Sequence, residues 1–302
     1  MLISTVKTLW GVTREMGNAP GNYASLFSRI KASGFSAVET PIWMIEDTVD
    51  FVAALTASGL KFVAMINTCL PPDDPHLGSR SLQSHIDSFD RQITLVMASI
   101  PAHLLLLINS HSGCDSWPLE RTIAFFTAAL AIEKEKGILV CHETHRGRAL
   151  YNPWVTRDVC RALPLLHLTA DLSHFVCVAE RVFAATDDDW NECLVEIKRA
   201  TRHIHARVGY AQGPQVNDPR ANEHLVAVTA HEKWWDAIVE HQSVHGTETL
   251  TIEPEHGVDG YQQCLPHSLK PVADVWEVNE WIREKLVSRY TSQGFAVDLP
   301  SK

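Results

Sequence analysis

A single closed α/β barrel, the (β/α)8 or TIM barrel, is the fold that the sequence predicts, on three observations. Short apolar runs alternate with longer amphipathic stretches along the chain, which is typical of parallel βαβ units. Eight such runs can be distinguished, and eight units favour closure into a barrel over an open sheet. Dense polar clusters follow the later runs directly, as expected where strand ends carry chemistry.

The predicted strands are apolar runs that end in polar or turn-forming residues. They lie at residues 3–10, 37–41, 62–68, 103–110 and 138–141, and at the start of segments 166–174, 203–210 and 250–257. In a parallel barrel all carboxyl ends of the strands meet at one rim, where active sites are built. Glu39, Asn109 and His111 follow earlier strands, so we expect them at the same rim as the later clusters.

Amphipathic stretches between the runs predict helices at residues 23–33, 48–58, 81–99, 119–136, 190–201 and 223–241. Gly34, Gly59 and Gly137 follow three of these stretches and predict helix ends, because glycine readily adopts the conformation that closes a helix. The acidic run 187–189 is interpreted as the start of a helix, where the helix dipole favours negative charge. Residues 151–153 are expected to turn the chain away from the fifth strand.

No linker or change of composition divides the chain. We therefore expect one barrel domain over residues 1–290 and a C-terminal tail over residues 291–302. The 302 residues are 45% hydrophobic and 21% charged, as in an ordinary globular protein with a large core.

Charge and cysteine content limit the classes of binding partner and the cellular locations that we expect. A formal net charge of −10 argues against nucleic acid and anionic membranes, because both attract basic surfaces. No basic and apolar leader is seen, and no run of about 18 apolar residues could span a bilayer. Seven cysteines without a CxxC pair predict reduced thiols and a cytoplasmic location.

Four of the later strand ends offer groups that can bind a metal ion. Glu143, Asp171 and His205 each follow a separate predicted strand, and both Glu253 and Glu255 belong to the last one. The spacing fits βαβ units of about 30 residues or more, so each ligand can come from its own strand. Glu253 and Glu255 face the same way in an extended strand, so parity does not choose between them. Three carboxylates and one imidazole predict one divalent metal ion, with Mn²⁺ preferred and Mg²⁺, Co²⁺ or Zn²⁺ as alternatives.

Short motifs at these strand ends are shared with a known family. They are HETHR at residues 142–146, DLSH at 171–174, HIH at 203–205 and PEHG at 254–257. By these motifs the chain resembles the xylose isomerase-like barrels, which include sugar phosphate isomerases/epimerases and ketose 3-epimerases. KTLWG at 7–11, GFSAVE at 34–39, RVGY at 207–210 and VADVW at 272–276 are similar to an uncharacterised branch of that family. The resemblance covers about residues 7–281.

The resemblance implies a role for each matching residue. The implied metal ligands are Glu143, Asp171, His205 and Glu255. Glu255 is preferred over Glu253 because the branch places its glutamate directly after a proline, although His256 replaces the aromatic residue that usually follows. Glu143 and Glu255 are implied as the catalytic pair that binds metal and exchanges protons. His174 is implied as a contact to substrate hydroxyls.

Further residues near the predicted rim suit a small carbohydrate substrate. Trp10 offers an apolar face to the C–H groups of a sugar, while Asn109 and His145 offer directional hydrogen bonds. Arg207 is a candidate for binding a substrate phosphate or carboxylate, and could equally pair with acids of the site. No glycine-rich phosphate loop or nucleotide-binding motif is present, so the sequence favours an unphosphorylated substrate.

The predicted function is that of a divalent-metal-dependent isomerase or epimerase of a sugar or sugar-like ketone. Proton abstraction next to a metal-bound carbonyl would give an enediolate. The alternative is a metal-dependent lyase or dehydratase that expels a β-leaving group after the same enolisation, from a keto-inositol or a 3-keto-glycoside. Two other classes of protein are disfavoured. A metallo-nuclease of this fold would need a basic groove, which the net charge of −10 argues against. A binding protein without turnover would have no need of the two glutamates. The resemblance also implies a homo-oligomer, a dimer or tetramer.

Overall fold

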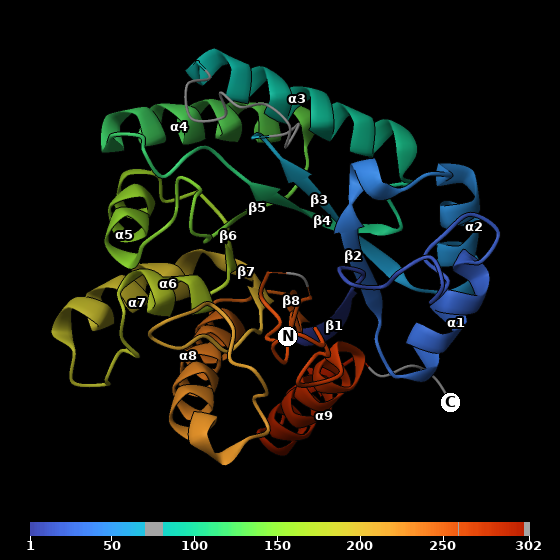
Figure 1. The fold of residues 1–302 in the computed structure, drawn as a ribbon. Coiled ribbons are helices and arrows are strands. Elements are labelled where there is room, and N and C mark those ends of the chain that lie inside the picture. The colour runs from blue at the N-terminus through green and yellow to red at the C-terminus, as the bar shows by residue number, and fades with distance from the viewer. Residues whose placement is uncertain (70–80, 259, 299–302) are drawn as a thin grey trace.

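The computed structural model describes residues 1–69, 81–258 and 260–298. Eight parallel strands close into a barrel with helices on the outside, which confirms the predicted (β/α)8 fold (Figure 1). The barrel closes because β1 pairs with β8 through its first residues and with β2 through its last. The strands are β1 (Leu2–Thr8), β2 (Ala37–Pro41), β3 (Lys61–Asn67), β4 (Leu105–His111), β5 (Val140–Glu143), β6 (Leu168–Ala170), β7 (Thr201–His205) and β8 (Thr249–Glu253).

Each predicted helical stretch contains a helix. These are α1 (Tyr23–Ala32), α2 (Thr48–Ser58), α3 (Leu82–Ser99), α4 (Leu119–Lys136), α7 (Asp188–Ala200) and α8 (Leu225–Val244). Three more helices were not predicted: α5 (Pro153–Ala162), α6 (Ser173–Val178) and α9 (Val275–Ser292). Short 3₁₀ turns lie at η1 (Ile42–Met44) and η3 (Asn222–His224).

Helix boundaries follow local chemistry. Gly59 and Gly137 close α2 and α4 in the left-handed conformation, with φ of 69° and 64°. Asp187 caps α7 by accepting a hydrogen bond from the Trp190 backbone N–H at 3.0 Å, which confirms the interpretation of the acidic run. Asn152, expected only as part of a turn, instead caps α5: its side chain accepts from the Val155 N–H at 2.8 Å. Pro153 occupies the first turn of that helix, where its fixed φ is favourable.

A two-residue strand, β9 (Ala296–Val297), lies within the segment expected as a C-terminal tail. It pairs in parallel with the first residues of β1, along the part of β1 that β2 does not reach. The Asp298 N–H donates to the Ile3 carbonyl at 2.8 Å. Residues 296–298 are therefore joined to the sheet by backbone hydrogen bonds.

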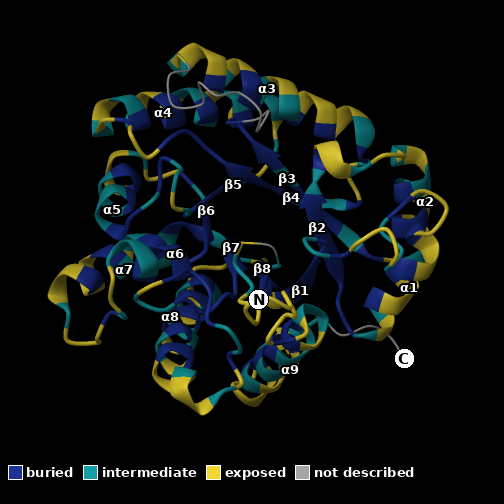
Figure 2. Ribbon diagram, in the orientation of Figure 1, coloured by how far each residue is buried: buried dark blue, intermediate teal, exposed yellow. Residues whose placement is uncertain are grey.

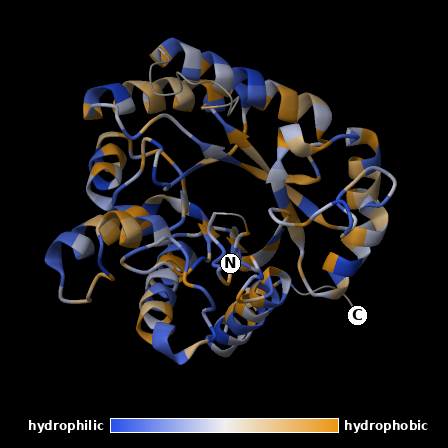
Figure 3. Ribbon diagram, in the orientation of Figure 1, coloured by the Kyte–Doolittle hydropathy of each residue, from blue (hydrophilic) through white to orange (hydrophobic). Residues whose placement is uncertain are grey.

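The core has two parts, one outside the strands and one inside. Two large apolar clusters pack the helices against the barrel, and a small one fills the lower barrel interior. Figure 2 shows buried strands and helices whose outer surfaces are exposed, and Figure 3 shows both hydrophilic and hydrophobic residues on these helices. Trp234 and Trp235 of α8 are 5% and 3% exposed, so they are packing residues. None of the described helices has the length and apolar character needed to cross a membrane.

Candidate metal centre

The barrel interior changes from apolar to polar toward the carboxyl ends of the strands. Side chains two residues apart on a strand face the same way. Ala37 and Cys141 belong to the small apolar cluster inside the barrel, and Glu39 and Glu143 follow them two positions later on the same face. Both glutamates are buried. The alternation of β2 and β5 therefore places carboxylates directly above the apolar floor.

The four predicted metal ligands converge at the rim. Glu143 ends β5, Asp171 follows β6, His205 ends β7 and Glu255 lies beyond β8. One ligand atom from each residue lies within 4.8 Å of the others, and all four residues are buried. We call these residues the upper cluster.

The donor set of the upper cluster fits a divalent cation. Glu143 Oε1 makes no hydrogen bond with the described residues. Buried polar atoms are normally paired, so this oxygen is suited to bind a ligand. Glu255 Oε2 and His205 Nδ1 lie 2.8 Å apart, close enough to bind one ion together. Three carboxylates and an imidazole are appropriate for Mn²⁺, Mg²⁺, Co²⁺ or Zn²⁺.

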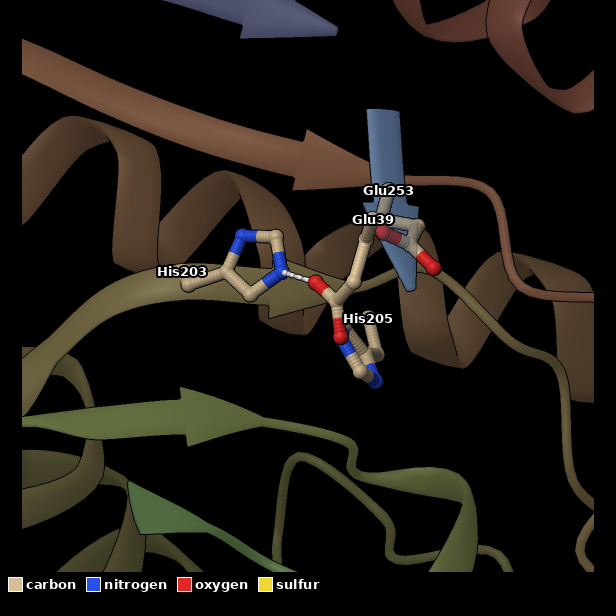
Figure 4. A group of neighbouring side chains, drawn as sticks. All are labelled: Glu39, His203, His205 and Glu253. Atoms are coloured by element: carbon tan, nitrogen blue, oxygen red, sulfur yellow. Dashed lines mark hydrogen bonds and ion pairs between the residues drawn. The ribbon is translucent and has the colours of Figure 1, made fainter. Parts of the chain in front are cut away.

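A second group of acids and histidines lies one layer deeper, nearer the start of the strands. It consists of Glu39, His203, His205 and Glu253 (Figure 4), and we call it the lower cluster. Glu39 lies between the two histidines: Oε2 is 3.0 Å from His203 Nε2, and Oε1 is 3.5 Å from His205 Nε2. Burial, together with the nearby Glu39 carboxylate, raises the pKa of Glu253 well above its usual range.

The two clusters separate the glutamates that the sequence could not distinguish. Both face the barrel interior, as their spacing predicts. Glu255 joins Glu143 and Asp171 in the upper cluster, whereas Glu253 joins Glu39 in the lower one. The geometry therefore favours Glu255 as the β8 ligand of the upper cluster. The sequence placed Glu39 at this rim, but gave it no role as a ligand.

Glu143 is held through one of its two oxygens. His111 Nε2 lies 2.6 Å from Glu143 Oε2, and Asn109 Nδ2 donates to the same oxygen at 2.9 Å. Asn109 Nδ2 also donates to Glu39 Oε1 at 2.9 Å, so this amide links the clusters instead of pointing freely toward substrate. Burial alone would raise the pKa of Glu143, but the His111 and His205 imidazoles hold it well below its usual range.

Arg207 pairs with acids of the site, the second of the two possibilities left open by the sequence. Its Nε donates to Asp171 Oδ2 at 3.1 Å, and its Nη2 contacts the same oxygen and lies 3.1 Å from Glu255 Oε2. Asp171 Oδ1 accepts from the Ser173 backbone N–H at 3.0 Å and from Ser173 Oγ at 2.5 Å. Burial nevertheless raises the pKa of Asp171 to about 6, despite the guanidinium.

Aromatic rings line the rim beside the upper cluster. The His145 ring centroid is 3.8 Å from that of His174 and 4.9 Å from that of His111. Burial holds the pKa of His145 and His174 well below the usual range, so both rings are neutral. Tyr261 Oη lies 3.3 Å from His145 Nε2, and its ring packs edge-on against Trp10 at 5.1 Å. Tyr261 was not predicted, because a lone aromatic residue in a loop carries no periodic signal.

Two cavities meet at Trp10. The smaller, of about 70 Å³, is lined by Glu39, Glu253, Glu255 and Trp10, among others. The larger, of about 760 Å³, extends from Trp10 to Lys7 and Trp276. Glu255 of the upper cluster lines the smaller cavity, whereas no residue of the upper cluster lines the larger one. The metal centre therefore lies beside the smaller cavity.

Comparison with known proteins supports the fold. No protein-family model and no curated protein matches the sequence. An AP endonuclease, family 2, from Brucella melitensis matches with a TM-score of 0.58 and 17% identity, over 93% of this chain and 98% of that one. A 3-keto-D-glucoside 4-epimerase from E. coli matches with a TM-score of 0.53 and 12% identity, over 94% and 99% of the two chains.

A third matching structure is a xylose isomerase-like TIM barrel protein from Mycobacterium smegmatis in complex with magnesium. Its TM-score is 0.54 at 13% identity, over 94% of this chain and 97% of that one. Identities this low show a shared fold and nothing finer. The resemblance to the xylose isomerase-like barrels is thereby confirmed at the level of the fold.

Proposed function

We propose that the protein is a divalent-metal-dependent isomerase or epimerase of an unphosphorylated sugar or sugar-like ketone. The observation that carries the proposal is the convergence of the upper cluster, whose ligand atoms lie within 4.8 Å of one another at the rim where barrels build active sites. A bound Mn²⁺ or similar ion would supply Lewis acidity that polarises a carbonyl and acidifies the neighbouring C–H bond. Proton transfer, orientation and exclusion of water then fall to residues of the chain.

Glu143 is the proton acceptor in this proposal. His111 and Asn109 hold its Oε2, while Oε1 accepts no hydrogen bond from the described residues. The pKa of this carboxyl is held low by the neighbouring imidazoles in spite of burial, so the group is ionised at neutral pH. A fixed, ionised carboxylate with one open oxygen is suited to take a proton from a carbon next to the carbonyl.

Glu255 is the second proton-transfer group. It follows β8, across the site from Glu143 on β5. His205 Nδ1 lies between the two acids, 2.8 Å from Glu255 Oε2 and 3.7 Å from Glu143 Oε1. Delivery of a proton by protonated Glu255 to the same carbon from the other face would invert that centre, and the proton removed from the carbon would remain on Glu143. Delivery by Glu143 to the adjacent carbon, with the hydroxyl proton moving to the former carbonyl oxygen, would interconvert an aldose and a ketose.

The surroundings of the upper cluster favour a neutral carbohydrate. Trp10 offers an apolar ring to the C–H groups of a sugar. His174 Nδ1 makes no hydrogen bond with the described residues and is suited to bind a hydroxyl. The charge of Arg207 is taken up by Asp171 and Glu255, so this guanidinium is not free to bind a substrate phosphate. This pairing favours a free sugar or a keto-glycoside over a sugar phosphate.

Solvent deuterium exchange tests the proposal. Mn²⁺-loaded protein in D₂O, incubated with free ketoses, keto-inositols and 3-keto-glycosides, is expected to incorporate deuterium next to the carbonyl of one substrate, as read by NMR. Chelated protein and Asp171→Asn should lose most of this exchange, since both lack the metal site. Product mass then separates the reactions, because an isomerase conserves mass and a lyase releases water or an aglycone. Exchange that persists without metal would contradict the proposal.

A further inference from the structure

We propose a second divalent-cation site directly below the first, with Glu39, His203 and Glu253 as its ligands. Two carboxylates and one imidazole suit Mn²⁺ or Zn²⁺. The site rests on the geometry of the lower cluster and does not depend on the reaction proposed above.

The lower cluster has the arrangement of a coordination shell. One atom from each of its four residues lies within 4.8 Å of the others (Figure 4). The residues come from three strands, β2, β7 and β8, which the closed barrel holds rigidly. Glu39 is 4% exposed and Glu253 is 1% exposed. A cation there would be enclosed by protein and not merely screened at the surface.

Glu253 supplies an independent observation. Its Oε2 is buried and has no hydrogen-bond partner among the described residues. Within the described part of the chain the ion-pair partners of Glu39 are His203 and His205, with no lysine or arginine among them. Burying an unpaired carboxylate is unfavourable unless a charge or proton compensates it. A cation between Glu39 and Glu253 would satisfy both acids at once.

His203 is oriented as a metal ligand by Thr251. Its Nδ1 lies 2.7 Å from Thr251 Oγ1 and 3.3 Å from the Thr251 carbonyl oxygen. His203 Nε2 and Glu39 Oε2 form a hydrogen bond of 3.0 Å. A cation bound between them would replace the proton on Nε2, with Nδ1–H then donating to the Thr251 carbonyl. Metal-binding histidines commonly fix their tautomer in this way.

His205 separates the two sites. Its Nδ1 faces Glu255 and Glu143 in the upper cluster, and its Nε2 faces Glu39 in the lower one. A neutral imidazole has one lone pair for a metal, so we assign His205 to the upper ion. The lower ion then takes three ligands from the chain and keeps open positions for water.

The cavity of about 70 Å³ gives the lower ion space and access. Glu39 and Glu253 line it, as does Glu255 of the upper cluster. A water molecule takes up about 30 Å³ in the liquid, so the cavity has room beside the acids for an ion with one or two waters. An ion passing Glu255 can therefore reach the lower acids.

Metal counting tests the second site. Protein stripped with a chelator, reloaded with Mn²⁺ and dialysed is expected to hold two equivalents per chain. Glu253→Gln, which keeps the shape and removes the charge, should hold one. Asp171→Asn in the upper cluster should also hold one, and the double variant none. A single equivalent in the wild type, or two in Glu253→Gln, would overturn the proposal.

A measurement on the unaltered chain keeps the test independent of how the variants fold. Crystals soaked in Zn²⁺ and measured at the zinc absorption edge should show two anomalous peaks, one of them about 2.0–2.2 Å from ligand atoms of Glu39, His203 and Glu253. A single peak in the upper cluster overturns the second site, whatever the activity. Conversely, two bound ions without deuterium exchange would contradict the proposed reaction and leave the second site standing.

Discussion

His111 Nε2 lies 2.6 Å from Glu143 Oε2, so an imidazole at the end of β4 fixes one oxygen of the carboxylate that ends β5. Asn109, two residues earlier on β4, donates to the same oxygen at 2.9 Å. The two contacts come from one strand face and leave Glu143 Oε1 directed elsewhere. The orientation of the proposed proton acceptor is therefore set by its neighbouring strand.

Replacing His111 tests this positioning role. His111→Asn should lower kcat by about 10- to 100-fold, the range typical when a residue that orients a ligand is removed. KM should change much less, because His111 orients Glu143 and is not proposed to bind substrate. Steady-state kinetics on the substrate found by deuterium exchange provide the measurement. His103→Asn, at an exposed histidine ahead of the same strand, is the control, and equal kcat values for the two variants would contradict the role.

Lys7 lies in an aromatic environment between the barrel and the outer helices. Its Nζ is 4.2 Å from the Trp276 ring centroid and 5.5 Å from that of Phe35. Burial lowers the pKa of this amine to about 8. Between pH 8 and 10.5 the Lys7 amine binds fewer protons in the folded protein than in the unfolded chain. The contribution of Lys7 to the free energy of unfolding therefore becomes more favourable as the pH rises through this window, and it is least favourable below pH 8.

Lys7→Met should accordingly stabilise the protein at neutral pH. The lowered pKa corresponds to about 3 kcal/mol of penalty for the charged amine, and loss of the cation–π contacts offsets part of the gain. We expect the free energy of unfolding to rise by about 2 kcal/mol at pH 7 and this gain to be nearly lost at pH 9.5, because the unfolded chain binds the extra proton less as the pH rises toward 10.5. Urea denaturation at both pH values measures it, with Lys134→Met at an exposed position as the control. A constant difference between Lys7→Met and wild type at the two pH values would refute this account.

Gly257 lies against Trp10 at the rim. A Cβ at position 257 would come within 1.9 Å of the Trp10 ring. Gly257→Ala should therefore displace Trp10, raise KM and reduce stability by about 1–3 kcal/mol, as is usual for overpacking. In a Trp10→Leu background the same change should have a much smaller effect, because the clashing ring is gone. Thermal denaturation of the wild type, the two single variants and the double variant measures the coupling free energy between positions 10 and 257. Additive effects of the two changes would show that the clash is relieved in another way.

Much of the site could be predicted because its signals are local. An apolar run ahead of Glu143 marks a buried strand, and the order of strands in a barrel then brings Asp171, His205 and Glu255 to the same rim. The parity of β8 even showed that Glu253 and Glu255 share a face. The layer that each occupies could not be predicted, since it depends on the stagger of β8 against β7 and β1.

The remaining features depend on contacts between distant segments or on ambiguous local chemistry. The hydrogen bond from Asn109 to Glu39 joins β4 to β2, and neither residue's neighbours in sequence indicate it. Asn152 and Pro153 suit a turn as well as a helix start, so the sequence gave no preference for α5. β9 has two residues, too few for any periodicity, and forms because the first half of β1 has an open edge.

Glu143→Gln tests the central claim, that a carboxylate at the end of β5 removes a proton next to a metal-bound carbonyl. The change keeps the size of the side chain and the contacts to its amide oxygen but removes the base. Deuterium exchange should be compared with wild type at saturating Mn²⁺, with bound metal and the far-ultraviolet circular dichroism spectrum recorded for both. We expect exchange to fall by about 10²- to 10⁴-fold while the fold persists. Wild-type exchange in Glu143→Gln, with the fold and the metal intact, would contradict the mechanism.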